Sequence, residues 1–469
     1  MKPPKKRILI LGGGFGGVYA ALRLEKLLAG KLAKREAEIT LVSRDNFFLF
    51  TPMLHEVAAS DLEITNIVNP LRKLLQHTQV VVGQATRIDL PNQRVSIQRG
   101  SKNKSDELIY DHLVLALGSH TNYFNLPGLE EFSVAMKTLP DAVQLRAQII
   151  QHLEDANSEC ILNDRRSLLT FVVAGGGFAG VETVASINDF VREALKFYPN
   201  LKEEMLRVVL VHPGAVILPE LGEELGRYAQ TVLARQGVEI LLNTRVTGMS
   251  EKQVTLGGAD PLPASTLVWT AGTIPNLLLS DLPCARERNR VVVNQFLHVP
   301  EWPSVWAIGD CAHVPDRGNP GKCHPPTAQH AIREGMLVAD NIAASLSSRP
   351  LKAFSFKTIG LLASIGRRTG VARIFGFNLS GFFAWWLWRT IYLSKLPGLD
   401  KKVRVAFEWT LDLVFHKDVC TVNDQPRRSS QNFDSAETAH GRNGAGQQMT
   451  SPEREPRPET SALEKLPDR

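Results

Sequence analysis

The chain carries two widely separated glycine-rich motifs of the same form. The first reads Gly-Gly-Gly-Phe-Gly-Gly from Gly12 and follows the apolar run 7–11. The second reads Gly-Gly-Gly-Phe-Ala-Gly from Gly175 and follows the apolar run 168–174. Each has the order of a buried strand, a tight turn and a helix, which is the setting in which the GxGxxG pattern indicates a dinucleotide site. Because the same setting occurs twice, coincidental turns are a poor explanation. The sequence therefore predicts two dinucleotide-binding units.

The glycines within each motif have different predicted roles. The first glycine permits the tight turn, the third leaves room for a pyrophosphate, and the last lets the helix pack closely on the strand. Free N–H groups and the positive end of the helix dipole then face the phosphates. The expected cofactor-binding residues of the two motifs are Gly12, Gly14, Phe15, Gly17, Gly175, Gly177, Phe178 and Gly180.

The length and composition agree with a chain of several domains. With 469 residues, 43% of them hydrophobic, the chain can bury two or three cores of ordinary size. Its five cysteines are scattered, odd in number and never spaced as CxxC, which favours a reducing compartment over a disulfide scaffold or a metal site. The basic start runs directly into the first strand and does not resemble a secretory signal. The net charge of +6 is modest, so no nucleic-acid partner is expected.

Alternating strand and helix patterns follow both motifs. Such alternation predicts an α/β fold with two doubly wound parallel sheets. A further strand over 305–310 ends in Asp310, and the carboxyl end of a parallel strand is where ligands bind in these sheets. From about residue 423 the chain becomes rich in polar residues, Pro and Gly, which predicts a disordered tail. The other expected strands are 38–42, 111–117, 208–211 and 266–272.

Several short segments together resemble the flavoproteins that have two dinucleotide folds. These segments are 116–119 (Ala-Leu-Gly-Ser), 269–272 (Trp-Thr-Ala-Gly) and 307–310 (Ala-Ile-Gly-Asp). Within that superfamily, residues 45–54 and 327–331 resemble the type II NADH:quinone dehydrogenases. The resemblance covers nearly everything up to about residue 420, with the motifs in the expected order. It implies that the first motif binds FAD and the second binds the nicotinamide nucleotide.

The resemblance also implies a domain order. An FAD-binding domain begins with residues 1–135, is interrupted by an NADH-binding domain over 136–284, and resumes over 285–350. A membrane-association region with amphipathic helices follows over 351–422. The expected disordered tail occupies 423–469.

The resemblance assigns cofactor contacts outside the two motifs as well. Asp310 is expected to hold the ribityl–phosphate part of the flavin, with Thr51 and Pro52 near the ring. The further cofactor contacts are expected at Ser43, Arg44, Ala116, Gly118, His212, Ala271, Gly272, Gly309 and Ala328.

Glu182, shortly after the second motif, is the first candidate catalytic residue. The resemblance gives this position a role in contacting the nicotinamide or in handling protons beside the flavin. Alternatively, Glu182 only complements the positive N-terminus of its helix. A carboxylate beside a charged cofactor is usually avoided unless it is useful, which favours the functional interpretation.

Gln329 is the second candidate. Residues 326–335 resemble the Ala-Gln motif of the family, in which the glutamine lies beside the quinone headgroup. An amide can hydrogen-bond a quinone carbonyl without adding a charge to an apolar tunnel. The alternative is a buried helix N-terminus capped by Thr327. The chain departs from the family pattern at Arg333, where a second glutamine is often found.

Two further departures concern the choice of nucleotide. An acid usually ends the second strand of a dinucleotide unit and binds the ribose hydroxyls. Here the corresponding positions are Ser43, followed by Arg44, and His212. Ser43 can still hydrogen-bond the ribose of FAD. His212 removes a carboxylate that would repel a 2′-phosphate, so NADPH is not excluded. The family resemblance implies NADH as the donor.

The region from about residue 351 to 420 predicts contact with a membrane. Between Lys352 and Phe407 the only acid is Asp400, whereas lysine and arginine recur throughout. The run 375–388 holds three tryptophans and is too short to span a bilayer, which takes about 20 apolar residues. A helix over 403–415 shows one narrow polar stripe on a broadly apolar surface. An anionic membrane surface is therefore the expected partner, and a packing or dimerisation surface is the alternative.

Together these features predict a peripheral flavoenzyme on the cytoplasmic side of the bacterial inner membrane. It would transfer a hydride from NADH to FAD and then two electrons to a membrane quinone. Without a spanning helix, proton pumping has no physical path, so none is expected. The oligomeric state stays open, with a homodimer as one form.

The residues bear differently on three other classes of protein. Sulfide:quinone oxidoreductases need paired redox cysteines and no nicotinamide site, and flavin disulfide reductases need a close cysteine pair that the stretch from Ser43 to Glu63 does not contain. A flavoprotein that is reduced by NAD(P)H but uses another acceptor, or that senses NADH, remains an alternative.

Overall fold

The computed structural model describes residues 5–100, 103–411 and 419–420. Contacts divide the chain into two units, Met1–Val422 and Asn423–Arg469, and every element below belongs to the first. The predicted disordered tail over 423–469 lies outside the described residues.

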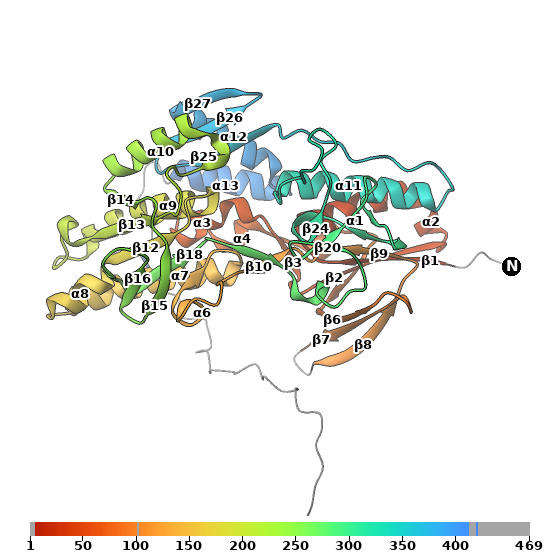
Figure 1. Ribbon diagram of the computed structural model, residues 1–469, viewed down its shortest axis with the longest axis horizontal. Helices are drawn as coiled ribbons and strands as arrows, with labels where there is room; N and C mark the ends of the chain where they lie inside the picture. The colour runs from red at the N-terminus through yellow and green to blue at the C-terminus, as the bar shows by residue number, and fades with distance from the viewer. Residues whose placement is uncertain (1–4, 101–102, 412–418, 421–469) are drawn as a thin grey trace, which may run out of the picture. The chain divides into compact units, whose positions relative to one another are not determined.

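The first glycine motif belongs to a six-stranded sheet with the strand order β22-β23-β9-β1-β2-β5 (Figure 1). The strand β1 (Lys6–Leu11) pairs in parallel with β2 (Ala37–Ser43) and β9 (His112–Leu115). The last four residues of β1 are buried, as expected for a parallel strand covered on both faces. The chain returns to this sheet after completing the second one, because two of its strands come late in the sequence. The remaining strands are β5 (Gln79–Val82), β22 (His298–Val299) and β23 (Trp302–Ala307).

The second glycine motif belongs to a five-stranded sheet with the order β11-β18-β12-β13-β14. All neighbouring strands in this sheet are parallel. The predicted α/β fold with two sheets of parallel strands is therefore confirmed, except that β22 at the edge of the first sheet is antiparallel to β23. The strands are β11 (Val134–Ala135), β12 (Thr170–Ala174), β13 (Arg207–Val211), β14 (Val238–Leu241) and β18 (Thr266–Trp269).

Equivalent helices follow the two motifs, α1 (Phe15–Leu27) after the first and α9 (Phe178–Ala194) after the second. The helix α11 (Ala328–Ser345) lies along α1 (Figure 1). A Cβ atom on Gly335 would stand 2.3 Å from the Gly16 carbonyl oxygen, so the two helix backbones touch there. The other helices of this part are α2 (Ala29–Ala33), α3 (Leu54–Ala58), α4 (Ile64–Ile67), α5 (Leu71–Leu74), α6 (Leu129–Phe132), α7 (Leu139–Ser158), α8 (Leu162–Leu168) and α10 (Glu223–Arg235).

Two connecting segments run between the sheets and pair with each other. These are β10 (Ser119–Thr121) and β19 (Thr273–Pro275), which are antiparallel. The remaining strands form two- and three-stranded sheets: β3 (Phe47–Leu49), β4 (Val68–Pro70), β6 (Gln84–Asp89), β7 (Arg94–Arg99), β8 (Lys104–Ile109), β15 (Val246–Ser250), β16 (Gln253–Leu256), β17 (Leu262–Pro263), β20 (Arg286–Glu287), β21 (Arg290–Val292) and β24 (Ala312–His313).

The C-terminal region combines a small sheet with two helices. The sheet is antiparallel and holds β25 (Gly360–Ser364), β26 (Gly370–Ile374) and β27 (Phe377–Gly381). The helices are α12 (Phe382–Lys395) and α13 (Leu399–Leu411). None of the helices in the described ranges has the length and apolar character needed to cross a membrane.

The three tryptophans of α12 do not share one environment. Trp385 and Trp388 are buried, whereas Trp386 is about half exposed. Residues three apart lie on the same side of a helix, so the spacing places one tryptophan on the opposite side from the other two. The sequence interpretation of this whole segment as interfacial is therefore too broad. The polar stripe predicted for the last helix consists of residues 404, 408, 412 and 416, of which 412 and 416 lie outside the described ranges. Glu408 accepts one hydrogen bond from the Asn66 side-chain amide and one from the Glu63 backbone N–H.

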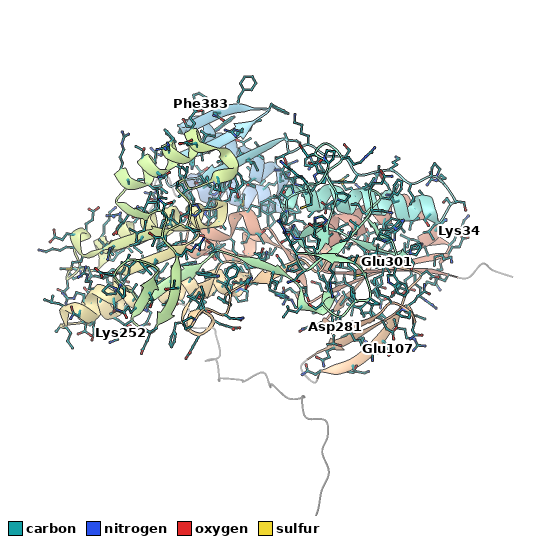
Figure 2. The ribbon with its side chains drawn as sticks, in the orientation of Figure 1. Lys34, Glu107, Lys252, Asp281, Glu301 and Phe383 are labelled. Atoms are coloured by element: carbon teal, nitrogen blue, oxygen red, sulfur yellow. The ribbon has the colours of Figure 1, made fainter. Side chains whose placement is uncertain are left out.

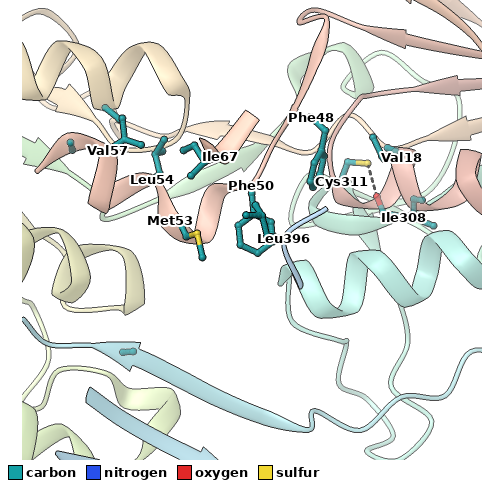
Figure 3. Close-up of a cluster of buried hydrophobic side chains, with 14 of the residues drawn as sticks. Val18, Phe48, Phe50, Met53, Leu54, Val57, Ile67, Ile308, Cys311 and Leu396 are labelled. Atoms are coloured by element: carbon teal, nitrogen blue, oxygen red, sulfur yellow. Dashed lines mark hydrogen bonds between the residues drawn. The ribbon is translucent and has the colours of Figure 1, made fainter. Parts of the chain in front are cut away.

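A continuous core joins the first sheet to the C-terminal region (Figure 3). Phe48 and Phe50, from the segment that resembles the family, share this core with Leu396 at the end of α12. Cys311 also lies there, and its thiol donates to the Ile308 carbonyl oxygen at 3.3 Å. Burial raises the pKa of the Cys311 thiol to about 11, so this cysteine is a packing residue that stays protonated.

Candidate functional site

The two glycine motifs have nearly the same backbone geometry. Gly12 and Gly175 have φ angles of +117° and +114°, which favour glycine. A Cβ atom on Gly12 would stand 2.1 Å from the Ala116 carbonyl oxygen. Cβ atoms on Gly17 and Gly180 would stand 1.9 Å and 1.8 Å from the carbonyl oxygen of the first glycine of their own motif. The turn and the close packing of helix on strand therefore both require glycine, as the sequence predicts.

The third glycine of each motif faces open space. Among the described residues, no heavy atom lies within 4 Å of the place where a Cβ atom on Gly14 or Gly177 would stand. These two residues are the N-caps of α1 and α9, so the first N–H groups of each helix face the same space. Each loop therefore fits a pyrophosphate, which binds where the backbone can approach it closely at a helix N-terminus.

Phe15 and Phe178, which stand between the motif glycines, are both half-buried. The Phe15 ring packs edge-to-face on Phe48 at a centroid distance of 4.9 Å. Phe178 is half-buried against the same large core. Both side chains thus pack against the same core.

The residues that end the second strand of each unit lie directly against the glycine loops. A Cβ atom on Gly13 would stand 2.4 Å from the Ser43 hydroxyl oxygen. In the second unit, Gly176 donates its backbone N–H to His212 Nδ1 at 3.0 Å. Arg44, next to Ser43, is exposed. Both loops therefore have a small or neutral polar group where an acid is usual.

Asp310 lies in a three-residue polar cluster that the sequence did not reveal. The Ser119 hydroxyl donates to Asp310 Oδ2 at 2.6 Å. Lys137 Nζ donates to the Ser119 hydroxyl oxygen at 2.7 Å and lies 3.4 Å from Asp310 Oδ2. The Lys137 backbone N–H is fixed by Asp141, which also forms the capping box of α7 with Thr138. The Thr-x-x-Asp capping pattern is visible in the sequence. The contact of Lys137, just before it, with Asp310 is not.

Gly309, the neighbour of Asp310, is held by a second buried acid. Its backbone N–H donates to Glu334 Oε2 at 2.7 Å, and its φ angle of +72° favours glycine. Burial raises the pKa of Glu334 to about 7, and the charge of Asp310 adds to this effect. The sequence did not indicate this role of Glu334, because a single acid on an apolar helix face does not show that it will accept the Gly309 N–H.

The other predicted cofactor contacts lie around these two loops. Thr51 is exposed and Pro52 half-buried in the short 3₁₀ helix Thr51–Met53. Ala116 is buried, and Gly118 has a φ angle of +66° with open space where a Cβ atom would stand. In the second unit, Ala271 and Gly272 follow β18, where Thr270 Oγ1 donates to the Ala174 carbonyl oxygen at 2.7 Å. Ala328 is half-buried at the start of α11.

Glu182 is buried and joins three parts of the chain. Its Oε1 atom accepts hydrogen bonds from the Ser364 backbone N–H at 3.2 Å and from the Trp388 indole N–H at 2.9 Å. Its Oε2 atom lies 4.0 Å from His55 Nε2. His55 Nδ1 in turn lies 2.9 Å from the Ser186 hydroxyl oxygen. The helix of the second motif is therefore tied both to the segment after Thr51–Pro52 and to the C-terminal region.

The environment of Glu182 favours its neutral form. Burial raises the pKa of Glu182 to about 8, although its hydrogen bonds with Ser364 and Trp388 oppose that rise. Burial and the charge of Glu182 also raise the pKa of the nearby Tyr392. At neutral pH the carboxyl therefore carries a proton that it can donate. The helix α9 begins at Phe178 and has no acid in its first turn, so Glu182 lies beyond the residues at which a carboxylate complements a helix N-terminus.

Gln329 lies in the first turn of α11. Its Nε2 atom donates to the Gly360 carbonyl oxygen at 2.9 Å. Thr327 is the N-cap of this helix, as the alternative interpretation expected, and its hydroxyl oxygen lies 2.7 Å from His330 Nδ1. Arg333, the departure from the family pattern, donates to the Gln329 carbonyl oxygen at 3.1 Å. Thr327 therefore caps the helix, and the Gln329 amide is at the same time fixed by the Gly360 carbonyl oxygen.

One short strand connects the two candidate catalytic residues. Gly360, the partner of Gln329, begins β25, and Ser364, the partner of Glu182, ends it. Four residue steps along an extended strand span about 13 Å, so the two side chains are attached about that far apart. No local sequence pattern indicates this arrangement.

Comparisons with known proteins agree with these features. The family model for pyridine nucleotide-disulphide oxidoreductases matches residues 6–335, and the model for the NDH2 C-terminal domain matches residues 359–418. The type II NADH:quinone oxidoreductase Ndh of Mycobacterium tuberculosis is 32% identical over 445 residues, which cover 90% of this chain and 92% of that protein. The demethylphylloquinone reductase NdbB of Synechocystis is 32% identical over 415 residues, covering 87% and 96%.

A solved structure supports the same relationship at the level of the fold. The structure of NDH2 from Plasmodium falciparum in complex with NADH matches with a TM-score of 0.81 at 20% identity, covering 89% of this chain and all of that one. The first family model covers both parallel sheets, and the second covers the C-terminal region. The chain belongs to the type II NADH:quinone oxidoreductases, a family of pyridine nucleotide-disulphide oxidoreductases.

Proposed function

We propose that this protein oxidises NADH and reduces a membrane quinone through bound FAD. The observation that carries the proposal is the pair of glycine loops with open space beside Gly14 and Gly177. The helix after the second loop contacts the first dinucleotide fold where Glu182 Oε2 lies 4.0 Å from His55 Nε2. The names of the relatives, which are NADH:quinone oxidoreductases, support the same reaction.

We propose that the first loop holds FAD, with Gly14 at the pyrophosphate, Ser43 at the ribose and Asp310 at the ribityl part. The FAD-binding part would comprise residues 1–135 and 285–350, and the NADH-binding part residues 136–284. When bound, FAD supplies the chemistry of accepting a hydride and passing its electrons on. The protein contributes the binding, the orientation and the handling of protons.

Lys137 is expected to support FAD binding by holding the Asp310 carboxylate and the Ser119 hydroxyl in place. A hydrogen bond to a charged group is worth about 1.5–3 kcal/mol, so Lys137→Met should weaken FAD binding about tenfold or more. Fluorescence titration of the apoprotein with FAD measures this change. Lys137→Arg should recover most of the affinity, and Lys252→Met should have no effect because Lys252 pairs with Asp164 on the surface. Equal FAD affinity in Lys137→Met and the wild type would contradict the role.

We propose that Gln329 orients the quinone headgroup. One of its two amide N–H groups is used by the Gly360 carbonyl oxygen, so the other is left to donate to a quinone carbonyl. We propose that Glu182, neutral at pH 7, donates a proton near the reacting atoms. Ser364 and Trp388 both donate to its Oε1 atom, which leaves Oε2, 4.0 Å from His55 Nε2, to carry the proton.

We propose that the C-terminal helices bind the anionic surface of a membrane. Their outward faces carry large apolar side chains, and Figure 2 shows Phe383 at the outer side of α12. The cations around them include Lys395 and Arg404, which are exposed. Large apolar side chains beside cations are typical of interfacial helices. The exposed apolar residues of α12 and α13 are Phe382, Phe383, Trp386, Leu399, Val403, Phe407 and Leu411.

Replacing two of these side chains should release the protein from vesicles. Phe383 is 76% exposed and Phe407 63% exposed, so replacing both by Glu should not disturb the core. Removing two aromatic side chains that the membrane would bury should cost about 3 kcal/mol of membrane affinity, or about 100-fold in partitioning. Sedimentation with phosphatidylglycerol vesicles measures this change. The matched control replaces Ile161 and Leu162 by Glu, since both are exposed on or beside α8.

Two other outcomes of that experiment would contradict membrane binding by α12 and α13. Unchanged sedimentation of the Phe383 and Phe407 variant would place the membrane contact elsewhere. A shift from dimer to monomer without loss of vesicle binding would make this surface a dimer interface. Truncation near residue 350 is a poorer test, because Trp388 and Val405 lie in the main core.

The proposed location is the cytoplasmic face of the bacterial inner membrane. The described cysteines, which are free, suit a reducing compartment. Anaerobic mixing tests the function as a whole: NADH should bleach the flavin absorbance of the purified protein, and a soluble quinone should restore it. Bleaching without recovery would remove quinone as the acceptor, and no bleaching would remove NADH as the donor.

A further inference from the structure

His212 occupies the position that governs the choice of dinucleotide. It directly follows β13, the second strand of its unit, where an acid usually binds the ribose hydroxyls of NADH. Such an acid discriminates in two ways, because it accepts hydrogen bonds from the ribose and repels the 2′-phosphate of NADPH. The residue at this position therefore decides how the site treats the additional phosphate.

The imidazole of His212 is built into the glycine loop. Its Nδ1 atom accepts the Gly176 backbone N–H at 3.0 Å. A Cβ atom on Gly176 would stand 2.6 Å from His212 Cγ, and one on Gly214 would stand 2.8 Å from Nε2. The ring is thus packed between two glycines that have no side chains to displace it. Its position next to the open space at Gly177 is set by the backbone of the loop itself.

This geometry makes the imidazole neutral. Because Nδ1 accepts a hydrogen bond, the ring proton is on Nε2. Burial lowers the pKa of His212, and the smaller effects of a hydrogen bond with the Val216 backbone and of the Glu220 charge act in the other direction. A neutral ring neither repels a phosphate nor pairs with it as a cation.

The segment after His212 brings no other charge to the loop. Residues 213–219 are Pro, Gly, Ala, Val, Ile, Leu and Pro. This segment returns to the motif, since the Leu218 N–H donates to the Gly176 carbonyl oxygen at 2.7 Å. The first acid beyond it is Glu220, which is exposed in the 3₁₀ helix Pro219–Leu221. Glu220 is therefore the one carboxylate of this turn that could take over the missing discrimination.

We infer that the second nucleotide site accepts NADPH as well as NADH, and that His212 is the residue that permits this. The inference rests on the proposed function, because it names the donors of the same hydride transfer. Residues 212–219 bring neither the carboxylate that would repel a 2′-phosphate nor a cation that would select for one. Both donors should therefore bind with similar affinity.

Binding of ligand fragments tests the inference without depending on catalysis. Isothermal titration of the FAD-loaded protein measures the dissociation constants of ADP-ribose and of 2′-phospho-ADP-ribose. In the wild type the two constants should differ by less than about tenfold. His212→Glu should weaken binding of the phosphorylated ligand at least about 30-fold relative to the other, because it places two anions together. The control His212→Gln is neutral and should keep the ratio of the wild type within about threefold.

Two results would overturn the inference. One is rejection of the phosphorylated ligand by about 100-fold or more in the wild type, with no further change in His212→Glu. The other is a gain of 2′-phosphate binding in Glu220→Gln alone, which would make Glu220 the discriminating residue.

Flavin reduction, followed in the same preparation, separates this inference from the proposed function. If both fragments bind but neither NADH nor NADPH bleaches the flavin, the proposed hydride transfer fails and the inference about binding stands. If NADH bleaches the flavin and the phosphorylated fragment is rejected, the inference fails and the proposed function stands.

Discussion

Gly177→Val should leave the protein folded and loaded with FAD but unable to be reduced efficiently by NADH. The N-cap position of Gly177 has φ −80° and ψ −174°, which any residue can adopt, and the space beside it is open. A valine would fill the space that the pyrophosphate of the nucleotide needs. Losing those backbone contacts should lower the rate constant for flavin reduction at limiting NADH about 100-fold or more. Anaerobic stopped-flow absorbance measures this rate constant.

The corresponding change in the first motif should have the opposite effect. Gly14 has almost the same backbone geometry, with φ −83° and ψ −168°, and equally open space. Gly14→Val should therefore fold but lose FAD, while nucleotide fragments still bind. This pair of variants assigns each loop to its own ligand. Gly30→Val is the matched control, because the space beside Gly30 is also open and it lies in α2, outside both loops.

Other outcomes would change the assignment. Loss of FAD in Gly177→Val and retention in Gly14→Val would exchange the two ligands. Normal FAD content and normal reduction by NADH in both variants would show that neither loop holds a pyrophosphate. A fold defect in either variant, seen as a lowered unfolding temperature of the apoprotein, would contradict the open space that the structure shows at these positions.

Glu182→Gln should slow quinone-dependent turnover about 100-fold while changing flavin reduction by NADH less than about threefold. General acids contribute about 100-fold or more, and glutamine keeps the shape of the side chain without its proton. Stopped-flow measurement of the two half-reactions separates the effects. Glu193→Gln is the control, because Glu193 lies on the same helix but pairs with Arg367 at 3.0 Å. Equal slowing of both half-reactions would show that Glu182 positions the nucleotide rather than donating a proton.

The pH dependence provides a second test of Glu182. Its pKa is raised from the ordinary value of 4.5 to about 8. Quinone turnover should therefore fall as the pH rises through about 8, where the acid loses its proton, and Glu182→Gln should lack this decline. The folded state binds the extra proton between these values, so the free energy of unfolding should fall by up to about 1.4 kcal/mol per pH unit in that range. Denaturant unfolding at pH 5 and pH 8 measures this slope, which Glu182→Gln should reduce.

Sequence patterns predicted the positions of the two loops because the relevant physics is local. A strand, a turn that needs a positive φ angle and a helix without a cap side chain occupy consecutive residues, so a glycine pattern is sufficient to reveal them. The same holds for Thr327, whose capping role depends on residues only three apart. The interpretation of all of α12 as interfacial was too broad, because composition does not show which side of a helix each side chain occupies. Only the packed helix shows that Trp385 and Trp388 face inward and Trp386 outward.

By itself, the sequence determined the α/β fold, the two dinucleotide loops and the set of residues from which the site is built. Only the tertiary structure decided how those residues are paired. Trp388 reaches Glu182 across 206 positions, and Lys137 reaches Asp310 across 173. Such pairs depend on how separate sheets and helices pack, and no periodicity in the chain encodes that distance. The charge state of Glu182 has the same origin, because burial by elements distant in sequence raises its pKa.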